Sequence, residues 1–116
     1  MIEYRVEGYS RDYYFKSIVK ARAFAIKETM KEPRPYMDNG MPVMNYYPKW
    51  IDAVPFIQAT GFKQQSGKAK NFGRISYIPE VQRFIWRPNR KNETAWIDKS
   101  GKVARRLTQK ERNLYL

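Results

Sequence analysis

Apolar and polar residues alternate one by one in several short segments of this 116-residue chain. Near the amino terminus the alternation covers residues 2–7, and it returns in residues 73–77 and 82–87. A period of two residues places successive side chains on opposite faces, so each segment is expected to form a half-buried β-strand. Short connections separate neighbouring segments, and strands joined by short turns pair antiparallel. The expected strands are residues 2–7, 13–15, 73–77, 82–87, 94–97 and 102–107.

Two segments have the features of an α-helix. Ser17 can cap the first helix, and Pro33 ends it. Spacings of three and four place on one face of this helix Val19, Ala23, Ile26 and Met30. A short C-terminal helix follows, for which Thr108 and Glu111 fit a capping box. The chain is therefore expected to form a single α+β domain, residues 1–116, with one main helix packed on a twisted antiparallel sheet.

Residues 33–55 have a different character, because five prolines interrupt this segment. Large aromatic and methionine side chains lie between the prolines, and disordered linkers avoid such groups. We therefore expect an ordered but irregular segment, in which Pro48 opens a short helix that runs through Val54. A strong turn signal lies within it at residues 38–40. The polar and basic residues 61–73 are expected to form an exposed loop.

The chain contains neither cysteine nor histidine. This composition excludes disulfides and thiolate metal sites, and it removes the commonest metal ligand and the commonest general base. No apolar run reaches the roughly 18 residues of a membrane-spanning helix, and no signal peptide opens the sequence. We expect a cytoplasmic protein with no metal, no cofactor and no membrane partner.

Positive charge is concentrated in the second half of the sequence. Of the net charge of +12, residues 1–60 contribute +2, with nine basic and seven acidic residues, and residues 61–116 contribute +10, with fourteen basic and four acidic residues. Such a surface favours a nucleic acid or an acidic protein face as its partner. The residues expected to contact that partner are Lys63, Lys68, Lys70, Arg74, Arg83, Arg87, Arg90, Lys91, Arg105 and Arg106.

The stretch GFKQQSGKAKNFGR, residues 61–74, shares glycines and a lysine with phosphate-binding loops. A Walker A loop needs four residues between its glycines and a serine or threonine after its lysine. Here five residues separate Gly61 from Gly67, and Ala69 follows Lys68. We therefore interpret the stretch as a basic contact loop and not as part of a nucleotide-hydrolysing site.

Acidic residues are too scattered to predict a nuclease. Metal-dependent nucleases gather carboxylates around magnesium, and the second half of this chain places its four in separate expected turns, loops and a helix start. A nucleophilic serine would also lack a histidine base. We expect a binding protein with no catalytic residue, not an enzyme.

Rings and charges lie on opposite faces of the strand expected at residues 82–87. Arg83 and Arg87 share one face, whereas Phe84 and Trp86 share the other. Single-strand binders combine a positive groove with rings on which bases stack. Rings on one side and charges on the other are also typical of an ordinary half-buried hairpin. The pattern is therefore compatible with both interpretations.

The opening MIEYRVEGYSRDYYFKSIVKARAFAIKE, in a short, aromatic-rich and cysteine-free chain, resembles small accessory proteins of phages and mobile elements. Anti-CRISPR inhibitors are one kind of such protein. The resemblance implies a non-enzymatic phage protein in the cytoplasm of a bacterial host, which binds a nuclease or nucleoprotein complex such as a CRISPR effector. Many such inhibitors are acidic DNA mimics, so this chain would instead contact guide RNA, target DNA or an acidic effector surface. The alternative is a general DNA- or RNA-binding accessory protein.

Overall fold

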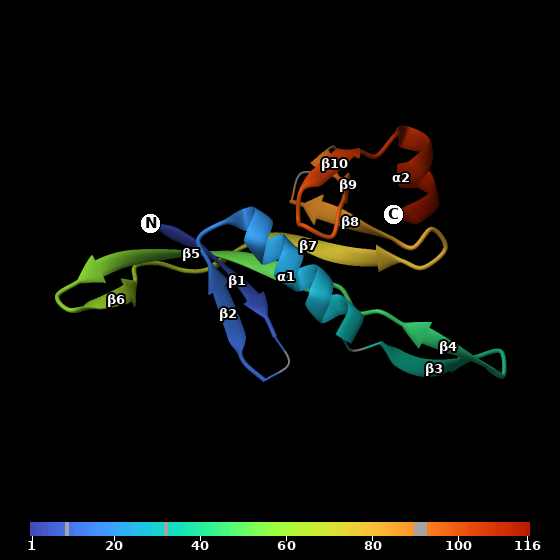
Figure 1. The fold of residues 1–116 in the computed structure, drawn as a ribbon, viewed down its shortest axis with the longest axis horizontal. Helices are drawn as coiled ribbons and strands as arrows, with labels where there is room; N and C mark the ends of the chain where they lie inside the picture. The colour runs from blue at the N-terminus through green and yellow to red at the C-terminus, as the bar shows by residue number, and fades with distance from the viewer. Residues whose placement is uncertain (9, 32, 90–92) are drawn as a thin grey trace.

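The computed structural model describes residues 1–8, 10–31, 33–89 and 93–116, and an antiparallel sheet dominates them (Figure 1). Along the main path the strand order is β10-β9-β8-β7-β5-β1-β2, and β6 pairs with the second half of β5. The predicted α+β class with an antiparallel sheet is confirmed. The eight strands are β1 (Ile2–Glu7), β2 (Asp12–Phe15), β5 (Lys49–Ala59), β6 (Phe62–Gln65), β7 (Lys70–Ile78), β8 (Arg83–Pro88), β9 (Ala95–Ile97) and β10 (Val103–Arg106).

Helix α1 (Ile18–Lys31) packs across one face of this sheet, which we call the helix face. The core beneath α1 consists of Val6, Ala21, Ala25, Ile26, Ile51, Ile75, Phe84, Trp86 and Ile97. The predicted apolar side of the helix was partly wrong, because Met30 is exposed and Ala21 and Ala25 are buried instead. These two small side chains allow α1 to approach the sheet closely.

The close approach extends to the turn between β9 and β10. Gly101 in this turn is buried, and a Cβ atom at this position would overlap the carbonyl oxygen of Val19 in α1. The Nε atom of Arg22 donates a hydrogen bond to the carbonyl oxygen of Gly101 at 2.9 Å. The Arg22 guanidinium also lies 5.3 Å from the ring centre of Trp86. Helix α1 is thereby fastened to the carboxy-terminal part of the sheet.

Most of residues 33–55 lie in strands, so the predicted irregular segment is wrong. Strands β3 (Arg34–Asp38) and β4 (Met41–Asn45) pair as a separate hairpin, which extends away from the main sheet in Figure 1. The predicted turn is present, because Asn39 and Gly40 connect the strands with φ angles of 50° and 79°. Two consecutive positive φ angles are typical of the tight turn of a two-residue hairpin.

Two prolines fit into this hairpin without breaking its ladder. In a two-residue hairpin the flanking pair, here Asp38 and Met41, exchanges hydrogen bonds, and the pairs alternate from there. Pro35 and Pro42 therefore fall at positions where the backbone nitrogen faces outward. Proline at such positions prevents another strand from pairing with the hairpin edge. The hairpin edges are blocked, while its side chains remain available for contacts.

Strand β5 replaces the predicted short helix at residues 48–54, and β6 together with the start of β7 occupies most of the predicted loop. Proline is rare inside strands, and Pro55 lies within β5. On one side, however, β5 pairs with β7 over residues 49–53 and with β6 over residues 56–59. Pro55 lies between these two partners, so its missing N–H removes no bond to either strand.

Helix α2 (Gln109–Tyr115) lies against the other face of the sheet. The predicted capping box is confirmed, because the Thr108 hydroxyl accepts from the Glu111 N–H and the Glu111 carboxylate accepts from the Thr108 N–H. Tyr115 of α2 packs onto a second core of Ile78, Ile85, Trp96 and Leu107. Helix α2 covers only the β8–β9 end of this face, and the face continues past it across β7 and β5.

Among the described residues, no helix has the length and apolar character required to cross a bilayer.

Candidate nucleic-acid interface

A row of cationic and aromatic side chains crosses the sheet face opposite α1. Trp50 on β5 pairs with Arg74 on β7, and Arg74 pairs with Arg87 on β8. Directly paired residues point to the same face of a sheet, so the three side chains are neighbours. Arg83 lies on the same face, because it is four residues before Arg87 on β8. We call this surface, Trp50 with Arg74, Arg83 and Arg87, the arginine face.

Trp50 provides an accessible ring at the β5 end of this row. Its side chain is 45% exposed, whereas most core rings of the sheet are buried. The Arg74 guanidinium lies 5.0 Å from the centre of the Trp50 ring, which is a cation–π distance. Arg83 is held in a similar way, 4.0 Å from the ring centre of the buried Trp96. Aromatic rings therefore position two of the three arginines.

Arg74 and Arg87 lie directly opposite each other, and like charges in such a pair destabilise a sheet. Partial burial lowers the pKa of the Arg87 guanidinium below its usual range, and the charge of Arg74 lowers it further. Arginine nevertheless keeps its charge at neutral pH. A bound anion would reduce the repulsion between these two cations, so the pair favours anion binding on this surface.

Other cations on the same side of the sheet already have acidic partners. Arg5 pairs with Asp52 at 2.9 Å. Lys63, a predicted contact residue, reaches from β6 to the buried carboxylate of Glu3 at 2.5 Å. The charge of Lys63 therefore neutralises a buried acid, and its ammonium also lies 4.8 Å from the Phe56 ring centre.

Arg105, another predicted contact residue, is paired with Glu111 of α2. Its two guanidinium nitrogens donate to the two carboxylate oxygens at 2.6 and 2.8 Å. Trp96 also donates to this carboxylate, at 2.9 Å from its indole nitrogen. The hydrogen bonds from Arg105 and from the backbone of Thr108 hold the pKa of Glu111 far below its usual range. Arg105 therefore fastens α2 to the sheet.

A β-bulge separates predicted contact residues that a regular strand would place together. The pairing of β5 and β7 shifts by one residue at Phe72, so Phe72 and Gly73 both lie toward the helix face. Lys70 consequently pairs with Ala53 on the helix face, while Arg74 points to the arginine face.

Lys68 is exposed in the segment before β7, and Arg106 pairs with Ala95, whose side chain points to the helix face. Arg90 and Lys91 lie outside the described residues.

Sequence reasoning missed Trp50, because it assigned this residue to an irregular segment. The prediction that rings and arginines lie on opposite faces of β8 is confirmed, since Phe84 and Trp86 are buried beneath α1. The ring that accompanies the arginines is Trp50 of β5, which lies 37 residues before Arg87 in the chain. Residues 50–57 do not alternate apolar and polar side chains, so no period-two signal marked Trp50 as part of a strand.

No group of three or more acidic residues with metal-binding geometry occurs within the part of the chain that the structure describes. Comparison with known proteins found no matching family model, no similar curated protein and no similar solved structure. Any assignment of function therefore depends on the arrangement of the residues themselves.

Proposed function

We propose that this protein is a non-enzymatic binding protein whose arginine face holds single-stranded nucleic acid. The observation that carries the proposal is the row of Trp50, Arg74 and Arg87, in which an exposed ring adjoins two opposed cations. An unpaired base stacks on the ring, and the backbone phosphates lie along the guanidinium groups. The phosphates also relieve the repulsion between Arg74 and Arg87.

Single strands fit this surface better than a duplex does. The arginine face is a flat sheet surface, and the long helix α1 packs on the opposite face, away from any nucleic acid bound here. Stacking on Trp50 requires a base whose face is free, as in a single strand. The three arginines on this face, Arg74, Arg83 and Arg87, supply the electrostatic attraction.

The first test is fluorescence anisotropy of labelled single-stranded DNA, RNA and duplex DNA at about 50 and about 200 mM salt. With three phosphates neutralised, affinity for a single strand is expected to fall roughly 20-fold between these concentrations. Trp50→Ala should weaken single-strand binding by about 5- to 100-fold, because one stacked base is lost. Trp50→Phe, which keeps a ring, should restore most of it. Equal affinity of wild type and Trp50→Ala would contradict the proposal.

A second candidate function is favoured by the hairpin of β3 and β4, which we call the arm. The arm exposes large apolar side chains on both faces, among them Tyr36, Met37, Met41, Val43 and Met44. It carries one cation, Arg34, and one anion, Asp38, in an otherwise strongly basic protein. A neutral apolar surface has no attraction for phosphate and fits a protein partner.

In this candidate, the arm binds the protein component of a nucleoprotein complex while the arginine face binds its nucleic acid. The blocked hairpin edges direct the arm to side-chain contacts in an apolar groove. An inhibitor of a CRISPR effector, as the resemblance implied, is one protein of this kind.

The arm is tested by inhibition of target cleavage by purified CRISPR effector nucleases loaded with guide RNA. Met37→Ser combined with Met41→Ser alters side chains that are 67% and 66% exposed, so the fold should persist. The double variant is expected to need about tenfold more protein for the same inhibition. Ile57→Ser with Phe62→Ser, on the other projecting hairpin, is the matched control. Absence of inhibition by the wild type, or equal inhibition by the wild type and the arm variant, would overturn this candidate.

A further inference from the structure

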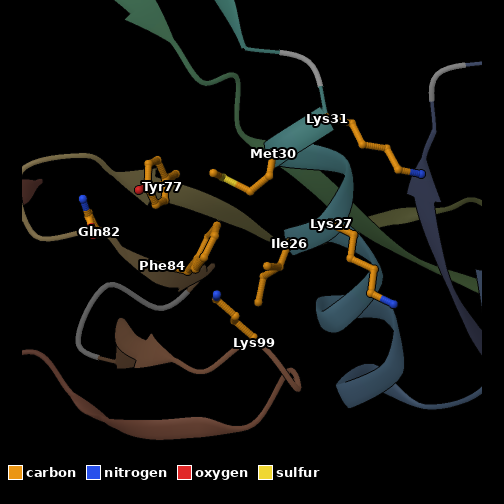
Figure 2. A pocket seen from close by; sticks show the side chains of 8 residues that line it. All are labelled: Ile26, Lys27, Met30, Lys31, Tyr77, Gln82, Phe84 and Lys99. Carbon is orange, nitrogen blue, oxygen red and sulfur yellow. The ribbon is translucent and has the colours of Figure 1, made fainter.

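A hollow lies on the helix face of the sheet, between α1 and the β7–β8 hairpin (Figure 2). It has a volume of about 560 Å³, within the range of small-molecule sites. Ile26 and Met30 of α1 form one wall, and Tyr77 of β7 and Phe84 of β8 form the other. The hollow therefore lies where the carboxy-terminal half of α1 passes over the β7–β8 hairpin.

The walls owe their shape to regular packing. Ile26 and Met30 are four residues apart, so they share one side of α1. Tyr77 and Phe84 are direct partners across β7 and β8, with ring centres 4.9 Å apart. Tyr46 also packs edge-on against Tyr77, with ring centres 4.8 Å apart. Rings held by neighbouring rings in this way present a preformed apolar surface, so little conformational freedom is lost when a ligand binds.

The charge around the hollow is positive. Its lining includes Lys27, Lys31 and Lys99 and no carboxylate. The ammonium of Lys31 is 3.0 Å from Glu28, and Figure 2 shows Lys27 and Lys31 extending away from the rings. Lys99, from the turn between β9 and β10, extends toward Phe84 and Ile26. One cation therefore lies at the edge of an apolar, partly aromatic wall.

The geometry points to a binding site for a small aromatic anion in this hollow. Its ring lies between Met30 and the rings of Tyr77 and Phe84, and its carboxylate, sulfonate or phosphate pairs with the Lys99 ammonium. Aromatic and thioether side chains favour a flat ring as the apolar part of the ligand. The inference is independent of the proposed function, because the hollow and the arginine face lie on opposite faces of the sheet.

The test uses 8-anilinonaphthalene-1-sulfonate, an aromatic sulfonate whose fluorescence rises in apolar surroundings. One saturable site is expected, and 1-naphthoate should displace the dye while the neutral 1-naphthalenemethanol does so at least tenfold less well. Lys99→Met keeps the apolar stem and removes the charge, so it should weaken dye binding about tenfold. Lys102→Met, in the same turn but outside the hollow, is the matched control.

Further variants and competitors decide among the sources of the ligand. Met30→Trp, at an exposed helix position, fills the hollow and should abolish dye binding without unfolding the protein. Displacement of the dye by adenosine monophosphate would show that the site accepts nucleotides. Displacement by 1-naphthoate but not by adenosine monophosphate would show that its ligands are simple aromatic acids. Undiminished binding by Lys99→Met and Met30→Trp, or competition by single-stranded DNA at the same site, would overturn the inference.

Discussion

Replacing Gly101 with alanine is expected to lower the free energy of unfolding by about 3 kcal/mol. Gly101 has a φ angle of +88°, which costs any residue with a side chain roughly 1–2 kcal/mol. The added methyl group also meets the backbone of α1 at Val19 and Ala23, which cannot yield as a flexible side chain would. Urea unfolding followed by tryptophan fluorescence measures the change.

Gly40→Ala is the matched control for this prediction. Gly40 has a similar φ angle of +79°, but nothing lies within 4 Å of the position that its Cβ atom would take. This variant should therefore lose only the conformational part, about 1 kcal/mol. Equal losses in Gly40→Ala and Gly101→Ala would show that the contact between the β9–β10 turn and α1 contributes nothing to stability.

The second large effect is expected from removing the opposed charges of the arginine face. Arg74→Gln combined with Arg87→Gln keeps most of each side chain and removes two phosphate contacts. Affinity for single-stranded DNA at about 50 mM salt should fall about 100-fold, and the slope of log K against log salt should become shallower by about 1.4. Anisotropy titrations at several salt concentrations measure both quantities.

The same double variant should unfold no more easily than the wild type, because it relieves a like-charge pair that costs about 0.2–1 kcal/mol. Lys16→Gln with Lys20→Gln is the control with equal total charge, on exposed positions in and just before α1. If this control loses as much affinity as the arginine double variant, the nucleic acid is attracted by the net charge of the protein and not by a specific site on the arginine face. If the arginine variant unfolds more easily, the two arginines serve stability instead.

Local sequence signals predicted those elements whose partners are close in the chain. The alternation in residues 2–7 and 82–87, the turn at residues 38–40 and the capping box of Thr108 and Glu111 each depend on neighbours within a few residues. The middle of the chain was mispredicted because proline was taken as a strand breaker. Pro35, Pro42 and Pro55 are tolerated by their places in the ladder, which only the pairing of strands reveals.

The candidate site was predicted in part for the same reason. Arg83 and Arg87 are on one short strand, so their shared face follows from the sequence alone. Trp50 joins them through the pairing of β5 with β7, and the bulge at Phe72 moves Lys70 to the opposite face. Lys63 pairs with Glu3 across 60 residues of chain, a contact that no local pattern indicates. Register and ion pairing thus depend on the tertiary structure.

The position of β5 in the sheet, between β1 and β7, also determines when the amino-terminal and carboxy-terminal parts of the sheet can join during synthesis. Strands β7, β8 and β9 each pair with the next strand along the chain, so each pair can form as soon as the later strand emerges from the ribosome. Strand β1 has only β2 as a partner until residues 49–59 have been made, because the strand that pairs with its other edge is β5. A two-stranded ribbon is marginal in water, so the amino-terminal third depends on α1 for cover during this interval. The eleven residues of β5 are therefore the point at which the two halves of the nascent chain become one cooperative unit.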